Sequence, residues 1–303
     1  MLETKKNRKL HLGLHELLTA ALIYSNEKIF SKPPLEILMH INEILAKDII
    51  VNKTELPIIF SESCYAILAQ AISAARCIKQ NICPGKISKI WLTDRSWPDE
   101  IQKFNIEKHG MKRYNSSDLV IKYKRKYYGI SLKRKKYEYE KDPPFLNKSF
   151  RSILSKDPVH SHILEEYNKN ENDVFSEIVE RAIKENIISV EEYSGNWKQY
   201  IKRIDNNYIN LCLQSNPIIQ RFCSTVFLEN VDLQKLMYTI ALRNDIKELE
   251  SRNFYFSVVL GIGNVRNDRL EVLEGKLINK TEKELKISVR YNGRFSSGIV
   301  CYI

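Results

Sequence analysis

Long apolar runs are missing from this 303-residue sequence. None approaches the roughly 20 residues that a helix needs to cross a bilayer. Residues 1–18 are basic, but they contain neither the apolar core nor the small-residue cleavage site of a signal peptide. We therefore expect a soluble cytoplasmic protein with no membrane partner.

Cysteine pairs are missing as well. The six cysteines are scattered and none belongs to a CxxC pair, which argues against a zinc site of the usual spacing. A disulfide scaffold is not expected in a chain this long, so we expect buried free thiols. The GxSxG, HExxH and P-loop motifs are also absent. With 43% hydrophobic and 10% aromatic residues, the composition is that of a globular protein.

Acidic residues are scarce in one part of the chain. The net charge is +11: residues 1–150 carry 27 Lys and Arg against 16 Asp and Glu, whereas residues 151–303 carry 21 of each. Residues 101–150 alone hold 14 basic and 5 acidic side chains. A basic excess concentrated in one segment indicates a polyanionic partner, most often nucleic acid. A lysine-rich genome, the alternative explanation, should spread basic residues evenly.

The apolar patterns predict an α/β fold with a mixed central sheet flanked by helices and a helical insertion. Four segments are expected: an N-terminal helical segment (1–60), a core with a basic hairpin (61–155), a helical region (156–252) and C-terminal strands that complete the sheet (253–303). Helices are predicted over residues 14–25, 34–48, 61–80, 96–111, 173–186, 196–213 and 233–252. Strands are predicted over residues 86–93, 118–123, 126–135 and 254–263, followed by a hairpin with a tight Asn-Gly turn at 291–294.

The predicted hairpin at 118–135 holds a lone acid, Asp118, at the start of its first arm. A two-residue loop at Arg125–Lys126 would pair Asp118 with Lys133 and bring their Cβ atoms to roughly 4.5–5.5 Å. Because Arg-Lys is not a favoured turn sequence, a shift of the turn by one position is an alternative. Either register leaves Asp118 and Lys133 neighbours.

Alternation along the second arm sorts its residues between two faces. Gly129, Ser131 and Lys133 share one face, and Ile130 and Leu132 point to the other, toward the core. The plainest interpretation of the lone acid with Lys133 is a cross-strand ion pair, worth at most about 1 kcal/mol at an exposed site.

The order of elements suggests a more specific interpretation. A helix, a strand, and a hairpin with Asp on its first arm and x-Lys on its second, followed by a helix, resembles the PD-(D/E)XK nuclease superfamily, which has a restriction-endonuclease-like fold. The resemblance covers residues 61–155. It implies that Asp118 binds a metal and that Lys133 is the catalytic lysine. Ser131 stands in place of the second motif acid, and Ser117 in place of the proline before the aspartate.

Phosphodiester hydrolysis explains why these residue types belong together. A metal polarises the phosphoryl oxygen and acidifies a water, and Mg²⁺, or Mn²⁺ in its place, prefers carboxylate, carbonyl and water oxygens. The resemblance implies that Asp118 supplies a carboxylate and Leu132 its backbone carbonyl. Lys133 would then orient or deprotonate the attacking water.

The charge that Ser131 cannot supply must come from another acid. We favour Glu62, at the start of the helix over 61–80, as a catalytic and metal-binding residue. Its rivals are Asp94, Asp99 and Glu100. Glu138 and Glu140 follow the lysine too soon, unless the strand bends.

Basic and aromatic residues alternate through the hairpin. The residues that we expect to contact nucleic acid are Lys122, Lys124, Arg125, Lys126, Arg134, Lys135 and Lys136, with Lys148 further on. Lys and Arg neutralise phosphates, and the interleaved tyrosines can donate hydrogen bonds to phosphates or stack on bases. The alternative is an edge hairpin that its lysines protect against aggregation.

These observations predict a Mg²⁺-dependent nuclease, with DNA endonuclease as the favoured activity and a homodimer as one possible arrangement. The alternative is a catalytically inactive nucleic-acid-binding or assembly protein that uses the basic hairpin. A third interpretation is a module whose basic face binds an acidic protein.

Overall fold

The fold is that of a computed structural model, which describes residues 13–51, 62–93, 97–104, 117–144, 147–154, 161–190, 193–227, 253–267, 269–278, 287–293 and 298–302. The chain divides into two compact units, one of residues 1–143 with 238–279 and one of residues 144–237 with 280–303. The predicted α/β class, with a mixed central sheet and flanking helices, is confirmed.

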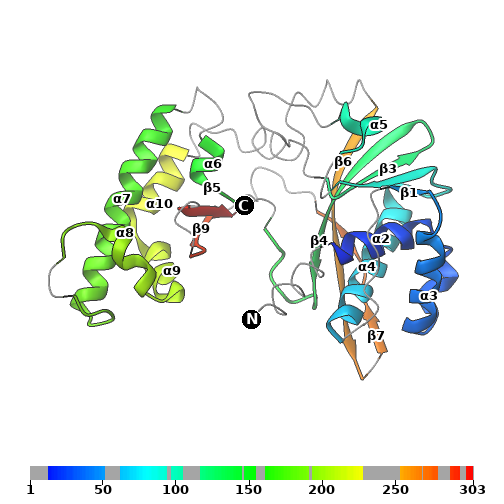
Figure 1. The fold of residues 1–303 in the computed structure, drawn as a ribbon, viewed down its shortest axis with the longest axis horizontal. Helices are drawn as coiled ribbons and strands as arrows, with labels where there is room; N and C mark the ends of the chain where they lie inside the picture. The colour runs from blue at the N-terminus through cyan, green and yellow to red at the C-terminus, as the bar shows by residue number, and fades with distance from the viewer. Residues whose placement is uncertain are drawn as a thin grey trace. The chain divides into compact units, whose positions relative to one another are not determined.

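The first unit is built on a mixed sheet with the strand order β1-β2-β3-β4-β6-β7, and β8 also pairs with β6 (Figure 1). Its strands are β1 (Ile50–Val51), β2 (Lys89–Leu92), β3 (Leu119–Tyr123), β4 (Lys126–Lys135), β6 (Phe254–Arg266), β7 (Arg269–Val272) and β8 (Lys276–Leu277). Strands β2, β3 and β4 form an antiparallel meander, whereas β6 runs parallel to β4. The longest parallel pairing therefore joins strands that are far apart in the sequence.

The backbone of helix α4 packs closely against the backbone of β6. The helices of this unit are α2 (Leu14–Tyr24), the 3-10 helix η1 (Glu27–Ser31), α3 (Pro34–Leu45), α4 (Glu62–Asn81) and α5 (Asp99–Gln102). A Cβ at Gly261 would overlap the Gln70 carbonyl oxygen of α4, so only glycine allows this approach. The Gln70 amide donates to the Gly263 carbonyl at 3.0 Å, and the Ile262 N–H donates to the Ser73 hydroxyl at 2.9 Å.

The sheet has two apolar faces, because side chains alternate along each strand. The helix face carries Leu119 and Ile121 and forms the larger core with α2, α3 and α4. The second face carries Val120, which packs in a smaller cluster with Trp91 and Phe254. No helix in the described part of the chain is long and apolar enough to cross a membrane.

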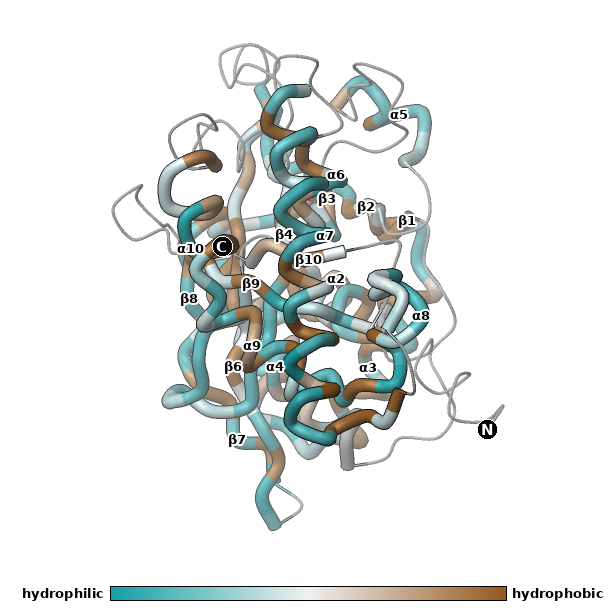
Figure 2. Tube along the Cα trace, turned by 90° about the vertical axis from the view of Figure 1, so that its left-hand side faces the viewer, coloured by the Kyte–Doolittle hydropathy of each residue, from teal (hydrophilic) through white to brown (hydrophobic). Residues whose placement is uncertain are grey.

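The second unit is mostly helical, with a three-stranded antiparallel sheet in the order β5-β10-β9. Its elements are β5 (Asn147–Ser149), α6 (Phe150–Leu154), α7 (Ser161–Lys184), α8 (Trp197–Tyr200), the 3-10 helix η3 (Ile201–Arg203), α9 (Asn206–Ser215), α10 (Pro217–Arg221), the π-helical η4 (Phe222–Phe227), β9 (Ser288–Tyr291) and β10 (Ile299–Tyr302). Apolar residues recur along α7 at helical spacing, and Figure 2 shows them as bands between hydrophilic residues. This stripe is the buried side of the helix.

The C-terminal strands differ from the sequence prediction. We expected residues 253–303 to complete one sheet, but β9 and β10 lie in the second sheet. Tyr291 pairs with Ile299, so a seven-residue connection replaces the tight turn predicted at 291–294. Local turn chemistry was the only signal for that turn, and the strand register overrides it.

Two predicted helices also change. Residues 196–213 were expected to form one helix, but the chain breaks at Ile204, which is extended, and Asp205 caps the next helix by accepting from the Asn207 N–H at 2.8 Å. The helix predicted over 233–252 lies outside the described residues. Of the one predicted over 96–111, α5 occupies Asp99–Gln102 and the part beyond residue 104 is outside them as well.

Candidate functional site

Asp118 stands at the start of β3 and is held between two neighbouring strands. Its N–H donates to the Ile130 carbonyl at 2.8 Å, and its carbonyl accepts from the Thr93 N–H at 3.2 Å. The Thr93 hydroxyl also donates to the Ser117 carbonyl. Strands β2 and β4 therefore fix the backbone from both sides. The Asp118 side chain is half-buried. Because its N–H and C=O bond to different strands, the regular alternation of β3, which begins at Leu119, does not extend to it.

The hairpin turns at Lys124–Arg125, one position earlier than in the first register that we considered. The regular pairing ends at Leu119 opposite Ile130, and the Asp118 N–H also donates to Ile130, so the predicted direct pairing of Asp118 with Lys133 is wrong. Lys133 lies two residues beyond Ser131, whose hydroxyl contacts the Asp118 carboxylate, and on the same face of β4 as Ser131. Lys124 supplies the left-handed residue of this turn, with a φ of 56°, a conformation that the sequence Arg-Lys gave no reason to expect.

Two groups of β4 orient the Asp118 carboxylate. The Leu132 N–H donates to its Oδ2 atom at 2.6 Å, and the Ser131 hydroxyl donates to the same atom at 3.3 Å. Ser131, in the slot of the second motif acid, is thus a positioning group. We expected the carbonyl of Leu132 to face a metal. The N–H and C=O of one strand residue point to the same neighbouring strand, so this carbonyl lies on the Asp118 side of β4.

Lys133 is half-buried and shares the second face with Ser131. Its backbone pairs with Leu260 of β6, which fixes the origin of the side chain inside the sheet and not at its edge. Among the described residues, none forms an ion pair with its ammonium group. Lys133 therefore lies on the face of β4 from which the Ser131 hydroxyl reaches the Asp118 carboxylate.

Gly129 leaves room for this arrangement. A Cβ at this position would overlap the Ser117 hydroxyl and lie 3.0 Å or less from the Phe254 ring. The residue before Asp118 and the first residue of β6 thus pack directly on the backbone of β4. A small residue here is a packing requirement of the sheet, which the sequence suggested only as a Gly-Ile-Ser stretch before the lysine.

Four residues were candidates for the second acid. The side chain of Glu62 and all of Asp94 lie outside the described residues, and Asp99 is exposed on α5. Glu100 binds Lys89 at 2.7 Å, and this hydrogen bond lowers the pKa of Glu100. No group of three or more His, Cys, Asp or Glu side chains that could hold a metal occurs in the described part of the chain.

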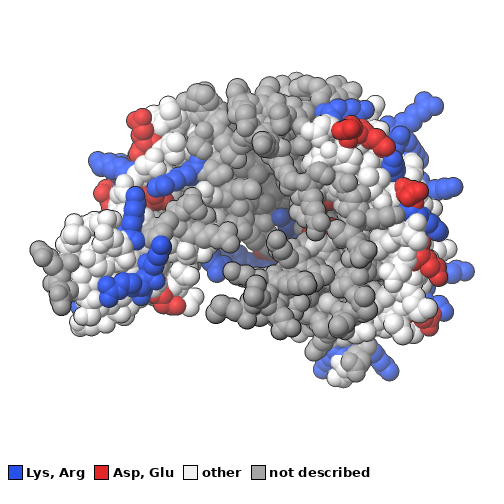
Figure 3. Space-filling view, in the orientation of Figure 1, with Lys and Arg blue, Asp and Glu red and all other residues white. Residues whose placement is uncertain are grey.

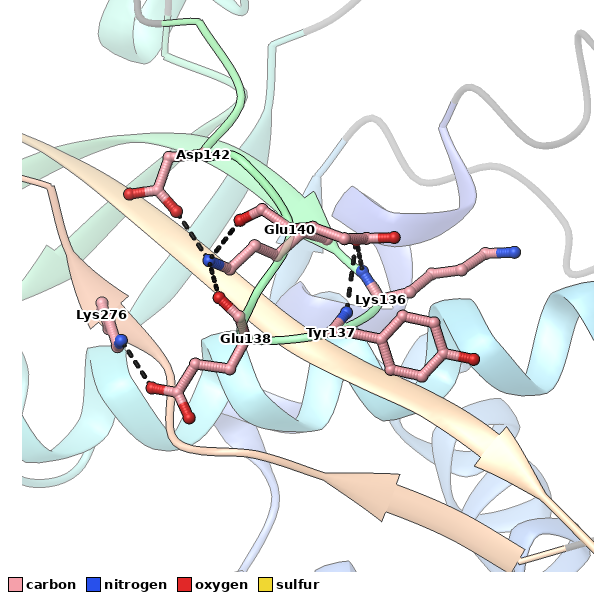
Figure 4. A network of polar contacts seen from close by, with 7 residues as sticks. Lys136, Tyr137, Glu138, Glu140, Asp142 and Lys276 are labelled. Atoms are coloured by element: carbon pink, nitrogen blue, oxygen red, sulfur yellow. Dashed lines mark hydrogen bonds and ion pairs between the residues drawn. The ribbon is translucent and has the colours of Figure 1, made fainter.

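Lys135 is a structural residue and not a surface one. Only 9% of it is exposed, and its ammonium donates to the Glu138 carbonyl at 2.9 Å, the Glu140 carbonyl at 3.2 Å and the Asp142 carboxylate at 2.7 Å (Figure 4). We expected Lys135 to contact nucleic acid, but burial and these three acceptors engage it inside the loop that follows β4. We therefore leave it out of the nucleic-acid surface.

Glu138 and Glu140 also have structural partners. The Glu138 carboxylate accepts from Lys276 at 2.8 Å, and this hydrogen bond lowers the pKa of Glu138. The Glu140 carboxylate accepts from the backbone N–H groups of Lys136 and Tyr137 at 2.7 and 3.2 Å (Figure 4). Both acids therefore organise the loop.

The remaining basic residues of the hairpin separate into two groups. The tip group, Lys122, Lys124, Arg125 and Lys126, lies at the turn. Arg134 and Lys136 are exposed at the other end of β4, and Arg134 lies about 26 Å from the start of the strand at roughly 3.3 Å per residue. Figure 3 shows Lys and Arg side chains projecting at the right-hand edge of the molecule, with acidic side chains among them. Because the two groups lie at opposite ends of β4, the basic stretch is not one continuous patch.

Aromatic rings support the lysines of the tip group. The ammonium of Lys122 lies 5.6 Å from the centre of the Tyr127 ring, that of Lys124 lies 5.1 Å from Tyr123, and that of Lys126 lies 5.0 Å from Tyr255. These cation–π contacts hold the charges at the tip. The tyrosine faces are thus covered by lysines, which favours phosphate contacts over base stacking at this end. Lys148, in β5 of the second unit, has a side chain outside the described residues.

Sequence reasoning missed two lysines near the tip group. Lys103 lies over both Phe104 and Tyr127, at 5.1 and 5.4 Å, and Lys89 lies 5.5 Å from the Trp91 ring. Alternation along residues 86–93 would have put Lys89 and Trp91 on one face. For Lys103 the sequence contains no such signal, because its position depends on how α5 packs against the sheet.

Comparison of the chain with protein-family models, with curated proteins and with solved structures found no match.

Proposed function

We propose that the protein is a metal-dependent nuclease that hydrolyses phosphodiester bonds, with DNA as the favoured substrate. The observation that carries the proposal is that two hydrogen bonds from β4 orient the Asp118 carboxylate, one of them from Ser131, which shares its face of the strand with Lys133. The order α4, β2, β3 and β4 is the order on which the resemblance to the PD-(D/E)XK superfamily rests.

The donor atoms at this end of β4 suit a hard cation. Mg²⁺ and Mn²⁺ bind carboxylate and carbonyl oxygens, and the Asp118 carboxylate and the Leu132 carbonyl lie on the same side of the strand. These two groups would hold the metal, with Glu62 as the proposed further acid. When bound, the metal would stabilise charge on the phosphoryl oxygens and lower the pKa of a water.

The residues of the chain would act through orientation and charge. The Leu132 N–H and the Ser131 hydroxyl keep the Asp118 carboxylate in one orientation, which lowers the cost of organising the site during the reaction. The Lys133 ammonium would place a positive charge beside the phosphate and orient the attacking water. Arg134 leaves β4 on the helix face, so we assign it no part in the hydrolysis.

The tip group supports a nucleic-acid substrate. Its lysines are held over aromatic rings, and Lys124 adopts a left-handed backbone conformation that costs a non-glycine residue of the order of 1 kcal/mol. The strand between the tip and Lys133 spans about seven base pairs of duplex DNA, at 3.4 Å per base pair.

The proposal is tested by cleavage of plasmid and single-stranded DNA with Mg²⁺ or Mn²⁺. We expect Asp118→Ala and Lys133→Ala to lower the cleavage rate by at least about 100-fold. Asp48→Ala and Lys86→Ala are matched controls, because both residues are exposed and lie outside the site. Full activity in both site variants would show that the cleavage belongs to another site.

A second candidate is a catalytically inactive nucleic-acid-binding protein. It is favoured by Ser131, which occupies the slot of an acid and donates to Asp118 instead of contributing a charge. In that case the wild-type protein would cleave none of the substrates, and its salt-sensitive DNA binding would survive both Asp118→Ala and Lys133→Ala.

A further inference from the structure

The loop after β4, residues 136–142, is rigidly built although it lies at the surface. The Lys135 ammonium donates hydrogen bonds to the backbone carbonyls of Glu138 and Glu140. The Glu140 carboxylate accepts hydrogen bonds from two N–H groups of the loop (Figure 4). The Glu138–Lys276 ion pair links the loop to β8. An ordinary surface loop of this length usually relies on turn residues alone. This loop is held in addition by a buried lysine and by a carboxylate that accepts from backbone N–H groups.

What this loop presents is an aromatic pair. The rings of Tyr137 and Tyr139 are stacked, with centres 5.2 Å apart and planes within 6° of parallel. Tyr137 is anchored, since its hydroxyl accepts from the Asn264 amide of β6 at 2.5 Å. Tyr139 is 84% exposed, so almost all of its ring surface outside the stack faces solvent. An exposed tyrosine stacked on an anchored partner is suited to receive another flat ring.

The charges in and beside the loop nearly balance, with Lys135, Lys136, Lys141 and Lys276 against Glu138, Glu140 and Asp142, but the acids and the two outer lysines differ in their partners. Its three acids are engaged: Glu138 with Lys276, Asp142 with Lys135 and Glu140 with backbone N–H groups. Its two lysines, Lys136 and Lys141, are exposed. The outward side of the loop therefore offers one aromatic ring and two ammonium groups, the combination that binds a single strand through a base and its phosphates.

We propose that the loop 136–142 is a stacking platform for an unpaired base, with Tyr139 beneath the base and Lys136 and Lys141 beside the flanking phosphates. This inference rests on the proposed function, because it takes the ligand to be nucleic acid. The loop begins three residues after Lys133, so the stacked base belongs to a nucleotide near the cleaved bond. A base within a duplex offers no free face. The platform therefore selects single strands, ends or opened base pairs.

The test is binding of a single-stranded oligonucleotide that carries the fluorescent base 2-aminopurine, measured in EDTA so that no cleavage occurs. Stacking on Tyr139 quenches the fluorescence. We expect Tyr139→Leu to abolish the quenching and to raise the Kd about 5- to 100-fold, the range for loss of one base–aromatic stack. Tyr139→Phe keeps the ring and should bind within about twofold of the wild type. The exposure of Tyr139 means that neither change disturbs folding.

A blunt duplex of the same sequence separates the possible outcomes. Unchanged duplex affinity in Tyr139→Leu, with weaker single-strand binding, supports the platform. Wild-type quenching in Tyr139→Leu, or equal losses for both ligands, overturns it. If Tyr139→Leu binds single strands normally while metal-dependent cleavage still requires Asp118, the platform is wrong and the nuclease proposal stands. If the wild type binds no nucleic acid, the platform proposal and the nuclease proposal are both wrong.

Discussion

Each of the two units contains a carboxylate that accepts a hydrogen bond from a strand N–H, and the two carboxylates have opposite surroundings. Glu171, in α7 of the helical unit, has a side chain that is 1% exposed and accepts from Tyr167 at 2.5 Å, from Ile299 N–H at 3.2 Å and from Arg151. Asp118 is half-buried and accepts from a backbone N–H and a hydroxyl. Full burial of a carboxylate requires a cation and several donors, so Glu171 serves the fold. Asp118, in contact with solvent, can still serve a reaction.

The largest effect is expected at Glu171. Glu171→Gln removes the charge that Arg151 and Tyr167 face, and we expect the free energy of unfolding of the helical unit to fall by about 3 kcal/mol or more. Burial, together with the Glu171 charge, raises the pKa of Tyr167, so this tyrosine remains a donor. Denaturant unfolding measures the loss, and hydrogen exchange should quicken in α7 and β10. Glu165→Gln, exposed on the same helix, is the control and should change little.

His15 tests whether a fully buried titratable group that has no partner of opposite charge among the described residues stays neutral. Burial, helped by the nearby Arg134 charge, lowers its pKa to about 3. Above a pH of about 6.5 the imidazole is neutral in both the folded and the unfolded chain, so stability does not depend on it. Below that pH, His15 becomes protonated in the unfolded chain but stays neutral in the folded chain. The free energy of unfolding then falls by about 1.4 kcal/mol per pH unit until the pH approaches 3.

The measurement for His15 is denaturant unfolding between pH 7 and pH 5, where the predicted loss is about 2 kcal/mol. His15→Leu should remove this part of the pH dependence. His162→Leu, at an exposed position of α7, should keep it. An unchanged pH slope in His15→Leu would assign the acid sensitivity to other groups.

Sequence patterns predicted the parts of the fold that depend on periodicity. The helices at 14–25, 34–48 and 61–80 and the strands of the meander are present because their apolar residues recur at helical or strand spacing. The burial of Lys135 could not be predicted, because alternation gives it the same face as Lys133 and only the folded loop brings Glu138, Glu140 and Asp142 to its ammonium. Asp118 was singled out correctly as a strand-start acid beside β4, but its partner depends on a turn that shifted by one residue.

Lys135 is a buried cation, as Glu171 is a buried anion, and we expect its substitution to lower the free energy of unfolding by a smaller amount. Lys135→Met loses three hydrogen bonds, but the acceptors lie near the surface and water can replace the lysine. We therefore expect the free energy of unfolding of the first unit to fall by about 1–2 kcal/mol. The exposed neighbour Lys136→Met should stay within about 0.5 kcal/mol of the wild type. Equal effects of the two changes, measured by urea unfolding, would mean that the buried ammonium adds nothing to stability.

The smallest effect on stability is expected at Asp118, and it is the sharpest test of the comparison. In Asp118→Asn the amide oxygen can still accept from the Leu132 N–H, and the side chain remains half-exposed. We expect the free energy of unfolding to change by less than about 1 kcal/mol. Cleavage, in contrast, should fall as in Asp118→Ala, because the negative charge is lost. Unfolding and cleavage are measured on one preparation, beside Glu171→Gln. If Asp118→Asn destabilised its unit as much as Glu171→Gln does, both carboxylates would be structural, and the nuclease proposal would lose the observation on which it rests.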